Sequence, residues 1–299
     1  MQSFSSGASR RLFLMGAASA TLAACGPKAP EKKAPAAEAP KAKPAAPSDA
    51  LADAVAGAWR SPEAKARDAW RHPVETLTFF GLKPGMTVVE FWPGAGWYTD
   101  ILAPFLAQTK GRLYAANLQP ADPASIQIVD AYKAKLAASP KIYGDVAVTA
   151  FGPTSGEVAP AGSADMVLFL RNLHNWMAAG IVDKAFRDAF AALKPGGVLG
   201  IEEHRAAPGG VQDVVSENGY VQQAYAIQLA KEAGFVLAEA SEINANPKDT
   251  KDHPFGVWTL PPTRLSSERG EPPKPGFDHA KYDAIGESDR MTLKLVKPK

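Results

Sequence analysis

The chain has 299 residues, with 33 basic and 31 acidic side chains, which gives a formal net charge of +2 at pH 7. This near balance leaves no basic surplus of the kind that nucleic-acid binding requires, so we expect no nucleic-acid partner. The single cysteine, Cys25, excludes an internal disulfide and a zinc site built from thiolates.

Residues 1–25 have the features of an export signal. Residues 9–14 read S-R-R-L-F-L, which matches the twin-arginine motif, and an apolar run over residues 12–24 begins within it. The run is shorter than the roughly 20 residues that a membrane span needs, so it predicts the core of a signal peptide. It ends in L-A-A-C, which resembles a bacterial lipobox and implies lipidation of Cys25; a free or buried thiol is the alternative. Gly26 after the cysteine favours the periplasmic side of the envelope, at the outer membrane.

Residues 26–48 are rich in Ala, Pro and Lys, and up to residue 47 they include no aromatic or β-branched side chain. Such a segment cannot bury enough apolar surface to fold, so it predicts a semi-extended tether. Its five lysines outnumber its two glutamates, which would suit anionic lipid headgroups, although a solubilising spacer explains the same composition. Residues 49–299 are long enough to form one α/β domain with an ample core.

Two helices are predicted at the start of this domain. Ser61 and Pro62 are suited to be an N-cap residue and a proline in the first helical position. A second helix begins at Pro73 and ends near Gly81. Both helices precede the first predicted strand.

Residues 82–102 predict a strand, a glycine turn and a helix in succession. A β-branched run at 87–89 predicts a buried strand, and an apolar pattern at helical spacing begins at Trp97. Between them lie Glu90, Gly94 and Gly96. This arrangement brings bare backbone N–H groups close to an anionic or polar ligand, as a nucleotide-like cofactor requires. A merely structural turn between a strand and a helix has the same pattern.

The rest of the chain alternates between predicted strands and helices. Residues 194–197, K-P-G-G, predict the C-terminal stop of the helix before them. A segment rich in Pro and charge at residues 246–275 predicts an excursion over the surface. The other predicted elements are strands at 111–117, 163–170, 198–201, 235–237 and 290–296, and helices at 181–193 and 219–233.

The glycine turn resembles motif I of the class I S-adenosyl-L-methionine (SAM)-dependent methyltransferases, which reads acid-x-G-x-G-x-G. Glu90, Gly94 and Gly96 match this motif, whereas Trp92 stands at its first glycine. The sequence L-K-P-G-G at residues 193–197 is a frequent signature before the fifth strand of that family. The resemblance implies an α/β, Rossmann-like domain whose mostly parallel, seven-stranded sheet has an antiparallel last strand and helices on both faces.

Three further motifs look like those of a bacterial family of exported, methyltransferase-like lipoproteins. They are R-H-P-x-E-T-L from residue 71, P-G-A-G-W-Y-T from residue 93 and R-N-L-H-N-W-M from residue 171. The resemblance runs from about residue 50 to the end of the chain and implies SAM as the cofactor. The residues expected to hold the cofactor are Glu90, Gly94, Gly96, Trp97, Tyr98, Asn117 and Arg171.

Chemistry in an open α/β sheet takes place beyond the carboxyl ends of the strands. His174, after the fourth predicted strand, is the first candidate for a general base, and His204, after the fifth, is the second. A helix-capping or core polar role for His174, and a solvated loop at residues 202–205, are the alternatives. A metal site at the two histidines has no support from their spacing, so no metal is predicted. The other candidates are Glu203, which would orient a histidine, and the substrate contacts Asn172, Trp176 and Arg205.

Two functions are consistent with these features. The first is methyl transfer from SAM to a small or envelope-associated acceptor, and the second is non-catalytic ligand binding by a lipoprotein of the same fold. SAM is made in the cytoplasm, whereas the signal directs the protein outward by a route that carries folded proteins, often with a cofactor bound. Asn117 stands where the family usually has an acid for the ribose hydroxyls, and it lacks the charge that strengthens such a bond. Trp92 and Asn117 are the departures expected if cofactor use had changed.

Overall fold

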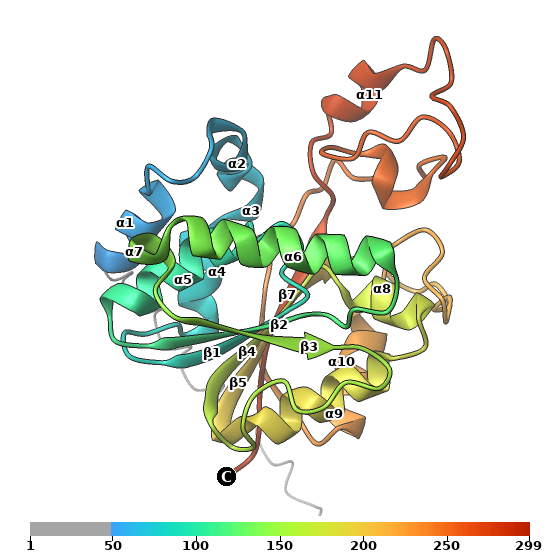
Figure 1. The fold of residues 1–299 in the computed structure, drawn as a ribbon. Coiled ribbons are helices and arrows are strands. Elements are labelled where there is room, and N and C mark those ends of the chain that lie inside the picture. The colour runs from blue at the N-terminus through green and yellow to red at the C-terminus, as the bar shows by residue number, and fades with distance from the viewer. Residues whose placement is uncertain (1–48) are drawn as a thin grey trace, which may run out of the picture. The chain divides into compact units, whose positions relative to one another are not determined.

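The computed structural model describes residues 49–299 (Figure 1). The predicted export signal, the lipidation of Cys25 and the predicted tether therefore lie outside the described residues. Within the described part, no helix combines the length and the apolar character that crossing a membrane would require.

A seven-stranded sheet, with strand order β3-β2-β1-β4-β5-β7-β6, forms the centre of the described part. Strand β7 is antiparallel to both of its neighbours, β5 and β6, and the other neighbouring strands are parallel. The predicted fold class, a mostly parallel sheet with an antiparallel last strand, is confirmed. The strands are β1 (Thr87–Phe91), β2 (Arg112–Leu118), β3 (Val146–Phe151), β4 (Ala164–Leu170), β5 (Leu193–His204), β6 (Val236–Ser241) and β7 (Arg290–Val296).

Helices pack on both faces of the sheet (Figure 1). Buried side chains of α1 (Asp49–Ala56), α4 (Pro73–Phe80), α5 (Thr99–Gln108) and α7 (Pro140–Tyr143) form one apolar cluster. Those of α8 (Leu173–Ala178), α9 (Val182–Ala192) and α10 (Gln223–Glu232) belong to the other. The remaining helices are α2 (Pro62–Ala66), α3 (Asp68–Arg71), α6 (Pro123–Ala138), the 3-10 turn η1 (Gly256–Thr259) and α11 (His279–Asp283).

Successive side chains of the central strands point alternately into the two apolar clusters. In β1, Val88 joins the cluster of α5, whereas Val89 and Phe91 join the cluster of α8 and α9. In β4, Phe169 stands edge-on to Phe91 and to Trp176, with ring centroids 4.9 and 4.7 Å apart. Because both faces are covered, these strands read as continuous apolar runs, which is why they were predictable from sequence.

Most predicted boundaries agree with the structure to within a few residues, and β7 occupies the predicted residues 290–296. Helix α9 ends at Ala192 with Leu193 as its C-cap, so the predicted helix stop is confirmed. The start of the next strand is a correction, because segment 193–197 is already the first part of β5. The N–H of Gly196 donates to the carbonyl oxygen of Lys297, so the segment pairs with the chain after β7.

Candidate functional site

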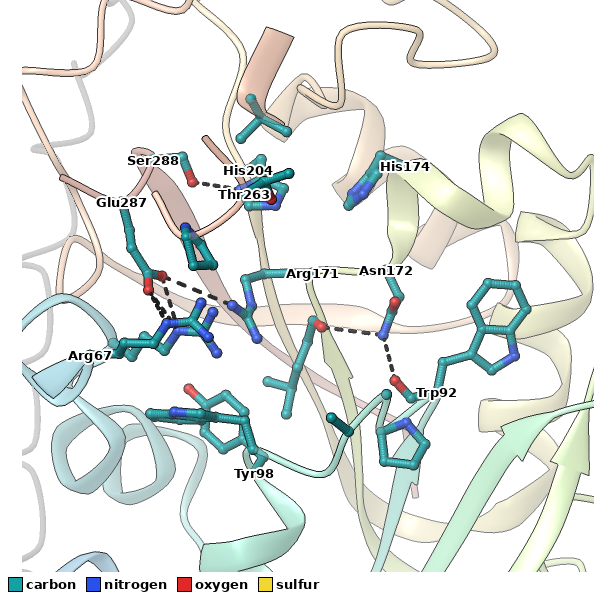
Figure 2. A pocket seen from close by; sticks show the side chains of 18 of the residues that line it. Arg67, Trp92, Tyr98, Arg171, Asn172, His174, His204, Thr263, Glu287 and Ser288 are labelled. Carbon is teal, nitrogen blue, oxygen red and sulfur yellow. Dashed lines mark hydrogen bonds and ion pairs between the residues drawn. The ribbon is translucent and has the colours of Figure 1, made fainter. Parts of the chain in front are cut away.

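A cavity of about 350 Å³ lies beyond the carboxyl ends of β1, β4 and β5 (Figure 2). The glycine turn after β1 forms one wall, and the residues that follow β4 form the next. Segments 257–263 and 287–288 close the other sides. The segment predicted as a surface excursion therefore supplies part of the wall.

Two non-glycine residues with left-handed backbone begin the loops after β1 and β4. Trp92 has φ 43° and Arg171 has φ 58°, and both line the cavity. For residues with a Cβ this conformation costs roughly 1–2 kcal/mol, and such strain concentrates at functional sites. The Nδ2 atom of Asn172 holds the two loops together, since it donates to the carbonyl oxygens of Phe91, Trp92 and Leu170 at 3.1–3.3 Å.

The glycine turn is open on the cavity side and packed on the other. Gly94 has φ 59°, lines the cavity, and has no heavy atom within 4 Å of the position a Cβ would take. Gly96 has φ 85° and faces α6, where the same position lies 3.1 Å from Nζ of Lys135. Lys135 also donates to the carbonyl oxygen of Ala95 at 2.9 Å, so α6 fixes the turn from behind.

Glu90, at the end of β1, is a buried carboxyl group in the cavity wall. It accepts a hydrogen bond of 2.6 Å from Oγ1 of Thr99, which lies 3.0 Å from the hydroxyl of Tyr132. Burial raises the pKa of Glu90 to about 7, against the opposing effect of the Thr99 hydrogen bond. Glu90 therefore changes charge close to neutral pH.

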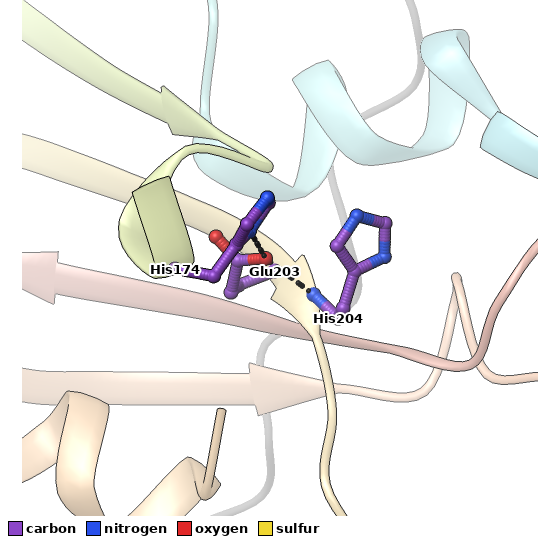
Figure 3. A group of neighbouring side chains, drawn as sticks. All are labelled: His174, Glu203 and His204. Carbon is purple, nitrogen blue, oxygen red and sulfur yellow. Dashed lines mark hydrogen bonds and ion pairs between the residues drawn. The ribbon is translucent and has the colours of Figure 1, made fainter. Parts of the chain in front are cut away.

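His174 and Glu203 form a buried pair at the ends of the neighbouring strands β4 and β5 (Figure 3). Nδ1 of His174 lies 2.9 Å from Oε1 of Glu203. The same carboxylate accepts the backbone N–H groups of Leu173 at 2.6 Å and His204 at 2.8 Å. We assign the proton to Nδ1 of His174 because Glu203 accepts from every other partner, and this leaves a lone pair on Nε2.

His204 faces His174 across 5.2 Å between ring centroids. Its Nδ1 lies 2.6 Å from Oγ of Ser288. Burial, and then the neighbouring His174 and Arg290, lower the pKa of His204 well below its usual value, so His204 is neutral at physiological pH. Ligating atoms of His174, Glu203 and His204 lie within 4.8 Å of one another, a convergence that the sequence spacing did not predict. Three N–H groups already occupy the oxygens of Glu203, so its observed role is to orient His174.

A second charged network lies on the opposite side of the cavity from His174 (Figure 2). Glu287 accepts from Nε of Arg67 at 2.6 Å, Nε of Arg71 at 2.9 Å and Nη1 of Arg290 at 2.8 Å. Nη1 of Arg171 lies 4.0 Å from the same carboxylate. One buried carboxylate thus lies among four guanidinium groups.

Tyr98 connects this network to the glycine turn. Its hydroxyl donates to Oε2 of Glu202 at 2.9 Å, and Oε1 of Glu202 lies 3.1 Å from Nε of Arg290. Burial raises the pKa of Glu202 and raises that of Tyr98 well above its usual value. Tyr98 is therefore a neutral hydrogen-bond donor.

The structure brings eight of the predicted site residues to the cavity wall. Gly96 and Glu203 lie behind the wall, at the back of the glycine turn and behind His174. The eight lining residues are Glu90, Gly94, Trp97, Tyr98, Arg171, Asn172, His174 and His204.

Three predicted site residues lie elsewhere. Arg205 forms ion pairs with Glu242 at 2.7 Å and Asp289 at 2.9 Å, and does not line the cavity. Trp176 is fully buried in the core, because its ring packs among the aromatic side chains at the ends of β1, β3 and β4. Asn117 is buried and outside the cavity, and its Nδ2 has no hydrogen-bond partner within residues 49–299.

Trp92 packs on the face of β2 that carries Ala116, and Asn117, the next residue, points to the other face. Nε1 of Trp92 donates to the carbonyl oxygen of Phe151 at the end of β3, so the indole spans the end of β2, which lies between β1 and β3. The cavity therefore fits the glycine-turn side of a SAM site, where Gly94 leaves open space. Asn117, the residue expected to hold the ribose, does not line this cavity.

Several wall residues were not identified from the sequence, among them Arg67, Glu287 and Ser288. Glu287 and Ser288 directly precede β7. The amino end of an antiparallel strand lies at the same edge of the sheet as the carboxyl ends of its neighbours. The prediction of an antiparallel last strand therefore already implied that the residues just before it lie at the site.

No protein-family model matches the chain, and no curated protein matches it. Among solved structures, it is similar to a putative sarcosine dimethylglycine methyltransferase from Galdieria sulphuraria, with 16% identity and a TM-score of 0.50 over 79% of this chain and 87% of that chain. It is also similar to the [4+2]-cyclase SpnF, with 15% identity and a TM-score of 0.50 over 83% of this chain and 91% of that chain. Sequence identities this low indicate a shared fold but not a shared reaction. These similarities show that the described part of the chain has the Rossmann-like fold of class I methyltransferases.

Proposed function

We propose that this protein is a SAM-dependent methyltransferase that acts on a small or envelope-associated acceptor. The observation that carries the proposal is that the free Nε2 of His174 and the open face of Gly94 belong to one cavity. A strand–glycine turn–helix unit beside a histidine–carboxylate pair provides both a cofactor cradle and a base.

The residues that would hold the cofactor are Glu90, Gly94 and the backbone of Ala95. SAM, when bound, supplies an electrophilic methyl group. The raised pKa of Glu90 lets this buried group accept or donate a hydrogen bond near neutral pH. Tyr98 and Trp97 line the same cavity, where the guanidinium of Arg71 already lies over the ring of Trp97.

His174 would remove a proton from the acceptor. Glu203 holds the Nδ1–H and stabilises the positive charge that forms on the ring when Nε2 takes the proton. His204 is neutral, so it does not repel that charge, and it can position the acceptor by a hydrogen bond. The segment that carries Trp258 covers this side of the cavity and limits the access of water.

Isothermal titration calorimetry of SAM and of its demethylated product against the full chain tests the cofactor. We expect saturable binding of both. Transfer of a labelled methyl group to small metabolites, abolished by His174→Ala but not by His279→Ala, would support catalysis. An absence of binding at millimolar SAM, with no thermal shift, would overturn the proposal.

The second candidate is a non-catalytic ligand-binding protein on the same fold. The position of Asn117 favours it, because this residue, expected to hold the ribose, is buried and does not line the cavity. Native mass spectrometry of protein purified from the periplasmic face distinguishes the two candidates. Bound SAM or its product supports the enzyme, and a different bound molecule supports the binding protein.

Export by the twin-arginine route and anchoring through a lipid on Cys25 are part of the proposal. Their support is the pair Arg10–Arg11, the apolar run after it and the L-A-A-C ending. The membrane would then be a partner through the lipid anchor, and the acceptor would lie on the periplasmic side of the envelope.

A further inference from the structure

The cavity contains a buried surplus of positive charge. Within the described residues, Arg67, Arg71, Arg171 and Arg290 converge on Glu287, and Glu202 is the other carboxylate of this network. Four guanidinium groups therefore face two carboxylates. Burial raises the pKa of Glu202, which weakens its contribution as a counter-charge.

Two of the three arginines that line the cavity have donors without a hydrogen-bond partner among the described residues. Nη1 of Arg71 and Nε of Arg171 have no hydrogen-bond partner in the part of the chain that the structure describes. The side chain of Arg71 is 3% exposed, and both residues line the cavity. Leaving a buried charged donor unpaired is costly, so these atoms indicate a missing acceptor in the cavity.

The position of Arg71 is fixed from two sides. Its guanidinium lies over the ring of Trp97, with the central carbon 4.6 Å from the ring centroid, and its Nε bonds to Glu287. A planar guanidinium held in this way presents its remaining donors in one direction, which suits two-point recognition of a carboxylate or phosphate.

We propose that Arg67, Arg71 and Arg171 form an oxyanion-binding subsite that holds a carboxylate or phosphate group of the acceptor. In Figure 2, Arg67 and Glu287 lie on one side of the cavity, His174 lies on the other, and Arg171 lies between them. An acceptor anchored by its anionic end thus extends toward Nε2 of His174. The identification of the ligand as the acceptor rests on the proposed methyltransferase function.

Inorganic phosphate and succinate are the probes for the subsite, titrated into the full chain by calorimetry. We expect saturable binding that Arg171→Gln and Arg67→Gln each weaken at least tenfold. The matched control is Arg264→Gln, which removes the charge of an exposed arginine paired with Asp283 and should change the affinity less than twofold. No saturable binding, or equal effects of Arg171→Gln and Arg264→Gln, would overturn the proposal.

Glu287→Gln should change the affinity for phosphate in the opposite direction to the arginine substitutions. It removes the internal counter-charge of the arginines, so phosphate should bind more tightly, by at least fivefold. The variant should also have a lower melting temperature without phosphate, and phosphate should raise that temperature by more than it does in the wild type. A purely structural arginine cluster would give the loss of stability without tighter binding, and this outcome would contradict the subsite.

The cofactor also carries a carboxylate, so a further comparison identifies the source of the anion. If the subsite belongs to the acceptor, phosphate binds in the presence of saturating SAM, and decarboxylated SAM binds as tightly as SAM. Competition between phosphate and SAM, together with weaker binding of decarboxylated SAM, would assign the arginines to the cofactor and overturn the acceptor subsite. Phosphate binding without any SAM binding would keep the oxyanion subsite and remove the methyltransferase proposal.

Discussion

Nε1 of Trp92 donates to the carbonyl oxygen of Phe151 at 2.9 Å, a bond that joins the ends of β1 and β3 across the strand between them. Trp92 also stands edge-on to Trp176, with ring centroids 6.0 Å apart. It adopts φ 43°, a left-handed conformation that glycine adopts without strain. The residue that replaces the first glycine of motif I thus keeps the backbone of a glycine and adds a side chain that lines the cavity.

Trp92→Gly should therefore enlarge the cavity beside the glycine turn. We expect SAM to bind about tenfold more tightly, and the free energy of unfolding to fall by about 2 kcal/mol, since packing is lost while backbone strain is relieved. Asn117→Asp should tighten SAM binding by about 1 kcal/mol in either background if the ribose lies beside this residue. It should also destabilise the fold, because the new carboxylate would be buried with a hydrogen bond to only one of its oxygens, from the N–H of Leu118. Calorimetry and urea denaturation of the four proteins measure both quantities, and unchanged SAM affinity in Trp92→Gly contradicts this account.

His174→Ala should lower kcat by roughly 10²–10⁴ with little change in SAM affinity, because the base is lost and the cofactor cradle is not. Glu203→Gln should lower kcat less, since Nε2 remains but its orientation and charge stabilisation suffer. Turnover and melting temperature must be measured on one preparation. If the loss of activity follows the unfolded fraction, His174 has a structural role only. Dialysis against a chelator should leave turnover unchanged when His174 acts as a base rather than as a metal ligand.

Glu90 should make the protein less stable as the pH rises toward neutrality. Its pKa is about 7 in the folded state and near 4.5 in the unfolded chain, so between these values the folded state holds a proton that the unfolded state has lost. The free energy of unfolding should therefore fall by up to about 3 kcal/mol between pH 4.5 and pH 7. Glu90→Gln should remove this part of the pH dependence, so the variant should gain stability relative to wild type on going from pH 5 to pH 8. A constant difference between the two proteins in urea denaturation at both pH values would contradict the prediction.

Gly94→Val should weaken SAM binding by at least about thirtyfold, because the side chain would enter the open space beside the turn. Gly209→Val is a matched control, since Gly209 also has a left-handed φ, of 82°, and open space around the Cβ position, but it does not line the cavity. Both variants should lose about 1–2 kcal/mol of stability from backbone strain. Only Gly94→Val should lose affinity for SAM. Equal SAM affinity of the two variants would exclude the glycine turn as the cofactor site.

Replacement of both Arg10 and Arg11 by lysine should leave an unlipidated, full-length precursor in the cytoplasm, because the twin-arginine export machinery recognises the two guanidinium groups. Cys25→Ala should abolish labelling by a fatty-acid analogue while export continues. Cell fractionation and metabolic labelling measure the two outcomes. Labelling that persists in Cys25→Ala would be incompatible with a lipid anchor at that residue.

The sequence predicted the elements whose side chains repeat a clear pattern. Strand β4 is apolar along most of its length, and Ser61 caps α2 by accepting a hydrogen bond of 3.1 Å from the N–H of Ala64. Strand β3 was not predicted, since it is a half-exposed edge strand without a continuous apolar run. Helix α6 was also missed, because only Val129 and Tyr132 are buried along its 16 residues.

The site was predictable to the extent that it depends on strand ends. His174 and Glu203 were expected at neighbouring strand ends, and the structure places Nδ1 of His174 2.9 Å from Oε1 of Glu203. The bond between Arg71 and Glu287 joins residues 216 positions apart, so no local pattern contains it. The direction of Trp92 depends on the packing of rings from β3 and α8, which the order of residues along β1 does not determine.

The place of β7 in the sheet has a consequence for the order of folding. In the described sheet, β6 reaches the other strands only through β7, although β7 (residues 290–296) follows β6 in the chain. The sheet therefore closes only after residues 290–296 have been synthesised and have inserted between β5 and β6. Until then β5 and β6 present unpaired edges, which are sites of aggregation. Loss of residues 290–296 would therefore remove the strand that completes the sheet, together with Arg290, whose buried charge connects Glu202 to Glu287.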